Sequence, residues 1–581
     1  MRHAATITLT SASTLTAMCV HLGRMRTPRF LSFASRVCFA LLLLIAHVAW
    51  SATTATVFNI LDYGAHRDGS APSTDAIRAA IQAAKAVGGG TVYVPAGSYL
   101  TGPIELVDNL VLHVDAGATL RFPAARLPFT KGRVQGIECL TPVPLIGGDH
   151  LKNITITGHG VLTTDNAEWV KLMGAPEPRT PTYPGSAFGP AWNHLRELLQ
   201  QKTPQPEAEY LKVAPFLRPA FIRTTECKNV LIEGVHIVGS SFWTIHLLYC
   251  QDAEVRDVNL ETFPGIFTGG LYIDSSRDVR VANCSFDCGD DSIALKAGKD
   301  ADGLRVNRPT ENVIITGCIV HRGSGAIVIG SETSGGIRNV AVSNIVCQGT
   351  QMGINIKTER GRGGFVENVR IDNVTMDNVS RPITVTQFYQ MQGEIPGGVP
   401  PEPVSVRTPT LRDIVISHVT IQRSSGLIDF SWNPISTTAS SGEGPHPLLV
   451  DIAGLPEMPI KGLRLSDVVI SGKAGLRAAN TAAMELQNVQ VNAETGPAFV
   501  IRDSTDLILQ GVSTRTPRPD APTIRLERTP GAVVSASRAF TGTGTFLSVP
   551  RGELKSIALE GDSLGNARQP TEETDAKFGV E

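Results

Sequence analysis

The sequence predicts an all-β protein, a single-domain right-handed parallel β-helix with an N-terminal capping helix. Three observations lead to this prediction: a short apolar phrase that recurs along the chain, secondary strands between its copies, and one amphipathic helical segment ahead of them. Repeats of roughly 20–50 residues are typical of solenoids, in which each copy buries its apolar face against the next copy.

The recurring phrase has the form Asn/Asp-Val-x-Ile-x-x-Val-x-Ile. Apolar residues alternate over short runs rich in β-branched types, and Asn, Asp and Gly separate the runs, which indicates strands rather than helices. Shorter strands such as GLYID, DSIALK and GINIK lie between the copies, so one coil holds at least two strands. Parallel connections are right-handed in nearly all proteins. The spacing between copies is 23, 26, 34, 27 and 29 residues when they are aligned on Val230, Ala253, Val279, Val313, Val340 and Val369.

A helical pattern precedes the first coils. Ile77, Ala80, Ile81 and Ala84 form one apolar face, with Ser73 or Thr74 as the N-cap and Gly88 as the stop signal. The strand TVYVPAG follows. We expect this helix to close the N-terminal end of the solenoid, because the end of a repeat stack needs a cap with one polar face.

An apolar run from Val37 to Trp50 follows Arg36 and ends at Ala49-Trp50-Ser51, a small-x-small cleavage site. The run is shorter than the ~20 residues that a membrane span needs. We therefore expect residues 1–51 to hold a signal peptide, with Met25 as the true start, and the protein to be exported to the periplasm or outside the cell. The 52 basic and 54 acidic residues nearly balance, which gives no sign of a nucleic-acid partner. No later segment resembles a membrane anchor.

Seven cysteines follow the leader. Cys227 and Cys250 open successive copies of the repeat, and Cys284 and Cys318 also share one register. Side chains one coil apart are roughly 4.8 Å from each other, so the geometry permits disulfides. Stacked buried thiols are the favoured interpretation, and the pairing stays open.

The stretch GDDSIALKAG, from Gly289 to Gly298, carries the strongest chemical signal. Alternation along the strand places Ile293 and Leu295 inside, and a bend at Gly289 brings Asp290 and Asp291 to one surface. A pair of acids in a groove can supply the proton donor and the water activator of glycoside hydrolysis. A solvated turn would carry the same two acids, and the surrounding repeat favours the site.

Two long stretches interrupt the repeat, residues 174–219 and 390–408. Both are rich in Pro, and the first contains the helical piece WNHLRELLQQ. Loops of this length are usually functional or disordered. We expect them to form the walls of a substrate groove, with mobile surface loops as the alternative.

The chain resembles the polygalacturonase family, glycoside hydrolase family 28, over nearly all of its length beyond the leader. The resemblance is carried by DYGAHRDG…GGGTVYVPAGSYLTGPI, LRPAFIRTTECKNVLIEGVHIVGSSFWTIHLLYC, GDDSIALKAGKDADG, GAIVIGSETSGG and INIKTERGRGG. It implies a cap with first coils over 52–125, a catalytic β-helix over 126–560 and a polar C-terminal tail over 561–581. It also implies a monomer without cofactor or metal that acts on pectic polysaccharide or oligosaccharide.

The resemblance further implies inverting hydrolysis, with Asp290 as the general acid and Asp291 as a group that helps to activate water. A second carboxylate nearby would raise the pKa of the acid by like-charge repulsion. Lys357 matches the family's lysine that grips the substrate carboxylate, and Tyr389 lies near its substrate-stacking tyrosine.

Three positions depart from the family's pattern. Gly269 stands in FTG where the family has a carboxylate, Ser324 replaces the histidine of Gly-His-Gly, and Asn355 replaces the arginine of Arg-x-Lys. These changes predict altered specificity, for rhamnogalacturonan or a decorated pectin. If only the third carboxylate is missing, Gly269→Asp should raise kcat.

Ser324, Asn355, Lys357 and Tyr389 are the candidate substrate-binding residues. Further cations near the pair suit an acidic polymer, or are solvated loop charges: Lys296, Lys299, Arg305, Arg322, Arg360 and Arg362. Two other function classes stay open. A catalytically weakened β-helix would bind pectic oligosaccharide without releasing reducing ends, and a polysaccharide lyase would yield an unsaturated product.

Overall fold

A computed structural model describes residues 56–172, 188–199, 201, 205–265, 267–389, 399–422 and 450–575. The contacts divide the chain into two units, Met1–Thr56 and Val57–Glu581, and all the described strands lie in the second. The expected signal peptide lies outside the described residues, as do residues 174–187 and 390–398 of the two expected groove loops. No helix in the described ranges is long and apolar enough to cross a membrane.

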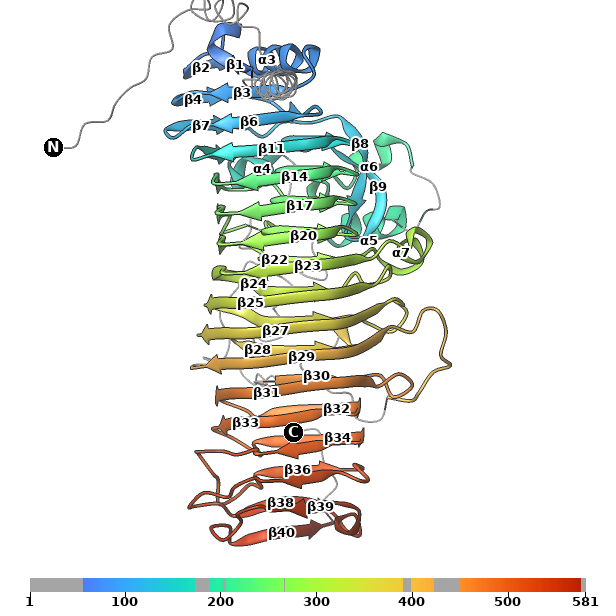
Figure 1. Cartoon of the computed structure of the whole chain (residues 1–581). Coiled ribbons are helices and arrows are strands. Elements are labelled where there is room, and N and C mark those ends of the chain that lie inside the picture. Colours follow the sequence, from blue (N-terminus) through green and yellow to red (C-terminus); the bar gives the residue numbers. More distant parts are fainter. Residues whose placement is uncertain are drawn as a thin grey trace, which may run out of the picture. The chain divides into compact units, whose positions relative to one another are not determined.

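The second unit is a stack of coils whose strands form three parallel ladders, and Figure 1 shows neighbouring strands of each ladder side by side. The first ladder runs through β1 (Val57–Asn59), β3 (Gly90–Val94), β6 (Leu110–Val114), β11 (Lys152–Gly158), β14 (Lys228–Glu233), β17 (Gln251–Arg256), β20 (Arg277–Ala282), β23 (Thr310–Thr316), β25 (Ile337–Gln348), β27 (Phe365–Asp377), β29 (Thr410–Ile421), β31 (Ile460–Gly472), β33 (Glu485–Ala493), β35 (Ile508–Gln510), β37 (Val533–Ser535) and β39 (Ala558–Glu560).

The second ladder is shorter and merges into the long strands of the middle coils. It comprises β2 (Asp68–Pro72), β4 (Gly97–Leu100), β7 (Ala118–Arg121), β12 (Val161–Thr163), β15 (His236–Val238), β18 (Asn259–Glu261), β21 (Ser285–Asp287), the first part of β24 (Ile319–Gly330) and the later parts of β25, β27, β29, β31 and β33.

The third ladder contains β22 (Ile293–Lys296), which follows the Asp pair in the sequence. It comprises β5 (Ile104–Glu105), β10 (Ile146–Asp149), β13 (Ile222–Thr225), β16 (Ile245–Leu248), β19 (Leu271–Asp274), β22 (Ile293–Lys296), the later part of β24, β26 (Thr350–Lys357), β28 (Arg381–Thr386), β30 (Val450–Ala453), β32 (Leu476–Ala482), β34 (Phe499–Thr505), β36 (Ile524–Glu527), β38 (Thr545–Pro550) and β40 (Gln569–Thr574).

The register of the first ladder confirms the predicted alignment of the repeat. Val230 pairs with Ala253, Ala253 with Val279, and so on to Val369. These side chains point inward and are at most 2% exposed. Each coil thus buries one apolar column against the next, which is where most of the hydrophobic stabilisation of a solenoid arises.

The polar residue that opens each repeat turns the chain. Asn312, Asn339 and Asn368 have φ between 51° and 57°, a left-handed conformation that Asn tolerates better than most residues. Their amides form a ladder from coil to coil, since Asn368 donates to Asn339 (2.8 Å) and Asn339 to Asn312 (3.0 Å). The Asn and Asp positions of the repeat therefore serve the turns.

The predicted N-terminal helix is present as α3 (Thr74–Ala86), and its buried residues include all four of the predicted apolar face. It packs against β1, β3 and the short helix η2 (Ile60–Tyr63). The other helices are α4 (Asn166–Leu172), α5 (Phe188–Leu199), α6 (Glu207–Leu211), α7 (Asp300–Val306), η3 (Ala214–Phe216) and η6 (Leu554–Ser556). Helix α5 contains residues 192–199 of the helical piece predicted within residues 174–219 and ends before its last two residues.

Two features differ from the sequence-based expectation. An antiparallel hairpin, β8 (Phe129–Val134) and β9 (Ile137–Pro142), leaves the stack and was not predicted. Strand β40 continues the third ladder by pairing with β38, within residues expected to be a tail. The seven described cysteines are buried free thiols, in line with the favoured interpretation.

Candidate active site

The outward-facing side of the third ladder brings together residues that are distant in sequence. Tyr272 of β19 pairs with Ala294 of β22, and Asp274 pairs with Lys296. Two coils beyond β22, Lys357 lies in the corresponding register at the end of β26. Asp274, Lys296 and Lys357 thus lie at one level of the stack, with Gly330 of β24 between the two lysines.

Asp290 and Asp291 lie at the turn into β22. A side chain at Gly289 would place its Cβ 2.1 Å from the carbonyl oxygen of Gly265, so this turn requires glycine for a close approach. Asp291 is 6% exposed, and Asp290 is half-buried. Ile293 and Leu295 point into the core as predicted. The local sequence thus presents both acids next to one another at one edge of the stack.

Two lysines flank the second acid. The Nζ atoms of Lys357 and Lys296 lie 3.5 Å and 3.9 Å from Oδ2 of Asp291. Lys296 also forms an ion pair of 2.7 Å with Glu332. Burial opposes the charge of Glu332, but Lys296 and Arg362 overcome it and lower the pKa of Glu332 to about 2. Two ammonium groups thus approach the carboxylate of Asp291.

The pKa of Asp290 is raised by its surroundings. Burial and the neighbouring charge of Asp291 raise the pKa of Asp290 to about 7, against the weaker opposing effects of Lys357 and Lys296. Asp290 therefore retains a proton close to neutral pH, while Asp291 lies beside two cations. A protonated acid beside a second carboxyl group is an arrangement that acid–base chemistry can use.

Stacked aromatic rings lie beside the acids. The rings of Phe242 and Trp243 stack at 5.4 Å, and those of Trp243 and Tyr272 at 4.0 Å with an angle of 7°. The Nζ atom of Lys296 lies 5.9 Å and 5.8 Å from the centroids of Trp243 and Tyr272. The rings thus limit the positions open to the lysine that pairs with Asp291.

The hairpin β8–β9 forms a wall of the site. Arg133 forms an ion pair of 2.7 Å with Asp274, and both side chains are fully buried. At the hairpin turn, the carbonyl of Gly136 accepts a hydrogen bond from the N–H of Lys299 (2.9 Å), and the N–H of Glu138 donates to Asp302 (2.9 Å). The hairpin therefore bridges β19 and the segment after β22. The Gln-Gly turn, followed by alternating apolar residues at Ile137 and Cys139, was the available signal.

The expected groove loops contribute differently. Helix α5 packs Leu195, Leu198 and Leu199 against Val134 and Ile137 of the hairpin, and Figure 1 shows α5, α6 and α7 on the hairpin side of the stack. The described residues of this stretch, 188–199 and 205–219, thus support the hairpin wall. The described part of the second loop, residues 399–408, approaches Arg360, whose guanidinium pairs with Glu402 (2.9 Å).

The predicted substrate-binding residues are not equally placed. Lys357 lies at the Asp pair, and its Nζ is 5.1 Å from the ring centroid of half-buried Tyr389. Ser324 is half-buried, and its N–H donates to the carbonyl of Asp290 (3.1 Å). These three residues lie around the acids. Whether they contact substrate remains a prediction.

Asn355 lies elsewhere than the sequence indicated. Its sequence position makes it a candidate substrate-binding residue, but it pairs with Val328 in β24, four residues beyond Ser324. It is fully buried, and its Nδ2 lies 2.6 Å from the sulfur of Met352. Asn355 thus presents no exposed surface to a ligand in this structure.

Most of the additional cations are already neutralised. Arg305 pairs with Asp302 and Glu138, Arg322 with Asp287, Arg360 with Glu457 and Glu402, and Arg362 with Glu359 and Asp300. The charges of these four arginines are thus balanced by neighbouring carboxylates, which disfavours a role with an acidic polymer. Lys296 and Lys357 lie next to the Asp pair, and both are themselves ion-paired with Asp291.

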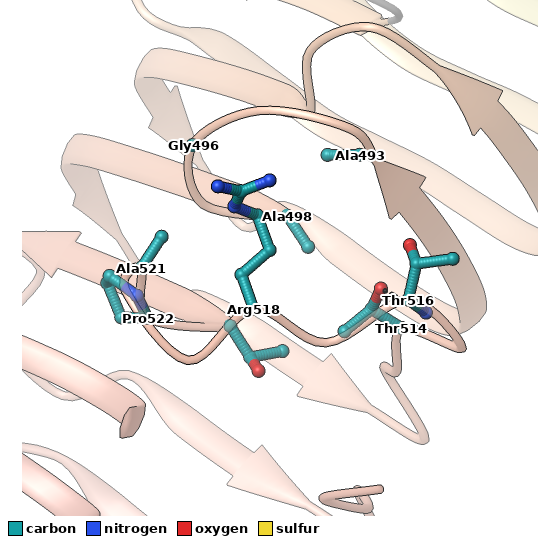
Figure 2. Close-up of a pocket in the computed structure, with 9 residues that line it drawn as sticks. Ala493, Gly496, Ala498, Thr514, Thr516, Arg518, Ala521 and Pro522 are labelled. Atoms are coloured by element: carbon teal, nitrogen blue, oxygen red, sulfur yellow. Dashed lines mark hydrogen bonds between the residues drawn. The ribbon is translucent and has the colours of Figure 1, made fainter. Parts of the chain in front are cut away.

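A separate small pocket lies in the C-terminal coils. Figure 2 shows the side chain of Arg518 beneath the loop that carries Gly496, with Ala498 and Ala521 nearby. The guanidinium of Arg518 is paired with Asp520 (2.8 Å). The lining contains no carboxylate or histidine, so this pocket offers no group for acid–base chemistry.

The chain is similar to proteins with known names. Residues 215–440 match the family Glycosyl hydrolases family 28, and residues 57–122 match the family Rhamnogalacturonase A/epimerase, pectate lyase-like. A probable polygalacturonase of Vitis vinifera is 27% identical over 345 residues, which are 57% of this chain and 63% of that relative. The chain thus spans less than two thirds of this relative.

Two further similarities extend over a larger share of the matched protein. An endo-polygalacturonase of Pectobacterium carotovorum subsp. carotovorum is 35% identical over 314 residues, covering 52% of this chain and 69% of the relative. The crystal structure of a hyperthermoactive exopolygalacturonase from Thermotoga maritima is 28% identical, with a TM-score of 0.60, and covers 75% of this chain and 91% of that one. The parallel coils, the Asp pair and these similarities agree, and the chain belongs to family 28 of the glycosyl hydrolases.

Proposed function

We propose that this chain hydrolyses glycosidic bonds of pectic polysaccharide in the manner of a polygalacturonase, with inversion at the anomeric carbon. The observation that carries the proposal is the contrast between the two acids, because Asp290 has a pKa of about 7 and Asp291 lies beside Lys296 and Lys357. Relatives with polygalacturonase names support the substrate class.

In the proposed reaction Asp290 gives its proton to the glycosidic oxygen as the bond to the anomeric carbon breaks. Asp291 accepts a proton from the water that attacks the opposite face of the sugar. Both acids thus exchange one proton each per turnover, which is the division of labour of an inverting hydrolase. The ammonium group of Lys357 is suited to a sugar carboxylate, although as a point charge rather than a bidentate clamp.

We further propose that the preferred polymer is rhamnogalacturonan or a decorated pectin rather than plain homogalacturonan. Asn355 is buried and Arg360 and Arg362 are paired with acids, so fewer cations are available for successive galacturonate residues. The match of residues 57–122 to the Rhamnogalacturonase A/epimerase family is in line with this preference.

The test is a reducing-end assay on homogalacturonan, methyl-esterified pectin and rhamnogalacturonan, with the anomeric configuration of the first product read by NMR. Faster release from rhamnogalacturonan with inverted configuration is the expected result. Homogalacturonan as the best substrate would contradict the altered specificity. Binding of these polymers without any reducing ends would make the chain a pectin-binding β-helix.

We also infer an exported monomer in which α3 caps the N-terminal end of the stack. The apolar face of α3 is buried on β1 and β3, which supports a capping role. N-terminal sequencing of the secreted protein and size-exclusion chromatography with light scattering test these two points.

A further inference from the structure

The hydroxyl group of Tyr272 has an unusual position for a buried phenol. Tyr272 is 1% exposed, and its Oη has no hydrogen-bond partner among the described residues. A buried hydroxyl without a partner costs about 1–3 kcal/mol. Such a group is retained most readily where a water or a ligand completes its hydrogen bonding.

The surroundings place this hydroxyl at the Asp pair. A Cβ atom built on Gly269 would lie 2.0 Å from the Oη of Tyr272 and 2.7 Å from the backbone oxygen of Asp291. The phenol therefore occupies the space into which a side chain at position 269 would point, and it lies beside Asp291. The absence of a side chain at Gly269 makes room for Tyr272.

The rest of the site holds the phenol in place. Its ring stacks on Trp243, and the Nζ of Lys296 lies 5.8 Å from its centroid and 3.9 Å from Asp291. Ala294, its neighbour in register on β22, has a small side chain. Burial, and then the charges of Asp290 and Asp291, raise the pKa of Tyr272 well above its usual value. The hydroxyl is therefore a neutral donor at every pH at which the enzyme would work.

We propose that Tyr272 holds the attacking water beside Asp291 by a hydrogen bond, and that Gly269 and Tyr272 form one functional unit. This inference rests on the proposed function. In the reaction, Asp291 takes a proton from the water, the water oxygen bonds to the anomeric carbon, and the proton of Asp290 goes to the leaving oxygen. Tyr272 keeps its own proton throughout and orients the water.

The first test is Tyr272→Phe, with Tyr99→Phe as the matched control. Tyr99 is also fully buried with a hydroxyl that has no partner in the described structure, but it lies on β4 in the first coils. We expect Tyr272→Phe to lower kcat by about 10- to 100-fold with little change in KM, because the contact matters in the transition state. Neither variant should lower Tm, and Tyr99→Phe should keep the wild-type kcat.

The second test is a double-mutant cycle between positions 269 and 272. Gly269→Asp alone should lower Tm, because its Cβ collides with the phenol. Its effect on Tm should be smaller in the Tyr272→Ala background, and Gly269→Asp with Tyr272→Ala should have a higher kcat than Tyr272→Ala alone. Additive changes in Tm and kcat would overturn the functional unit.

The outcomes separate the two proposals. A wild-type protein that cleaves no pectic polymer overturns the proposed function, and the role of Tyr272 falls with it. A wild-type protein that is active, together with a Tyr272→Phe variant of unchanged kcat, overturns the role of Tyr272 alone.

Discussion

Asp290 and Asp291 are adjacent in sequence yet differ in their electrostatic environment. The lysines that approach Asp291 come from β22 and β26, and Lys357 lies 66 positions along the chain from it. Burial, and then the charge of Asp291, raise the pKa of Asp290 against the weaker opposing effects of the two lysines. The difference between two chemically identical side chains is thus created by the stacking of coils.

Removal of the acid tests this assignment. We expect Asp290→Asn to reduce kcat by about 10²–10⁴-fold, the range that a general acid contributes. Asp278→Asn is the matched control, because Asp278 lies in an Asn/Asp turn of the first ladder, accepts a hydrogen bond from Asn312 and has the left-handed φ that Asn tolerates. Initial-rate assays on the preferred polymer measure both. Residual activity of Asp290→Asn above about one part in a hundred would contradict the assignment.

The pKa of Asp290 predicts the pH dependence of rate. The acid must be protonated to donate, so kcat/KM should fall as the pH rises through about 7. A pH–rate profile between pH 4 and 9 measures this limb. A profile that stays level to pH 9 would exclude Asp290 as the acid.

The same group predicts a pH dependence of stability. The folded protein binds a proton at Asp290 that the unfolded chain, with a pKa of 3.8, has already released, so its contribution to stability is present below pH 3.8 and lost as the pH rises through about 7. Asp290→Asn should therefore raise the free energy of unfolding at pH 8 by on the order of 2–4 kcal/mol. The gain should vanish below pH 4. Urea unfolding at both pH values measures it, and a gain that is equal at both would refute the linkage.

At the scale of elements, a buried ion pair between Arg133 and Asp274 joins the hairpin β8–β9 to strand β19. Arg133 reaches Asp274, which also lies 3.3 Å from Nε2 of His246. The carboxylate would be left without its cation if Arg133 were removed, and a buried charge without a partner costs about 3–5 kcal/mol.

We therefore expect Arg133→Met to lower the free energy of unfolding by about that amount and to increase hydrogen exchange in residues 129–142. Arg322→Met is the control, because Arg322 is 48% exposed in its pair with Asp287 and such pairs contribute about 0–1 kcal/mol. Equal losses for the two variants would show that the hairpin is held by other contacts.

At the scale of the whole molecule, the last described strand of the third ladder is β40, and only one of its edges is paired within the described residues. β40 covers β38, and Asp290 lies many coils away on the same ladder. Stability in a solenoid is close to a sum of nearest-neighbour terms, and an uncovered strand edge promotes aggregation.

Truncation after Glu560 should consequently lower Tm and increase light scattering, while kcat at 25 °C stays unchanged. Truncation after Asp575 keeps β40 and should behave as the full chain. Loss of activity in the shorter variant at temperatures where it remains folded would contradict the local character of the coils.

The sequence alone determined the fold and the position of the Asp pair, whose catalytic role stays a prediction. The inward column from Val230 to Val369 pairs as its spacing predicts, because burial of every second residue in each coil imposes a single register. The sequence also predicted the Asp pair and the strand that ends at Lys296, because these residues follow one another within one coil. These features depend on local periodicity.

Only the tertiary structure decided the rest of the site. The pairing of Arg133 with Asp274, the burial of Asn355 and the phenol of Tyr272 in the space beside Gly269 depend on contacts between coils and with the hairpin. For that reason the expectation that Gly269→Asp would raise kcat is not supported, since the phenol fills the space. The lengths of the loops set which coils come into contact. The apolar repeat does not indicate which polar side chains come into contact on the outer surface of the coils.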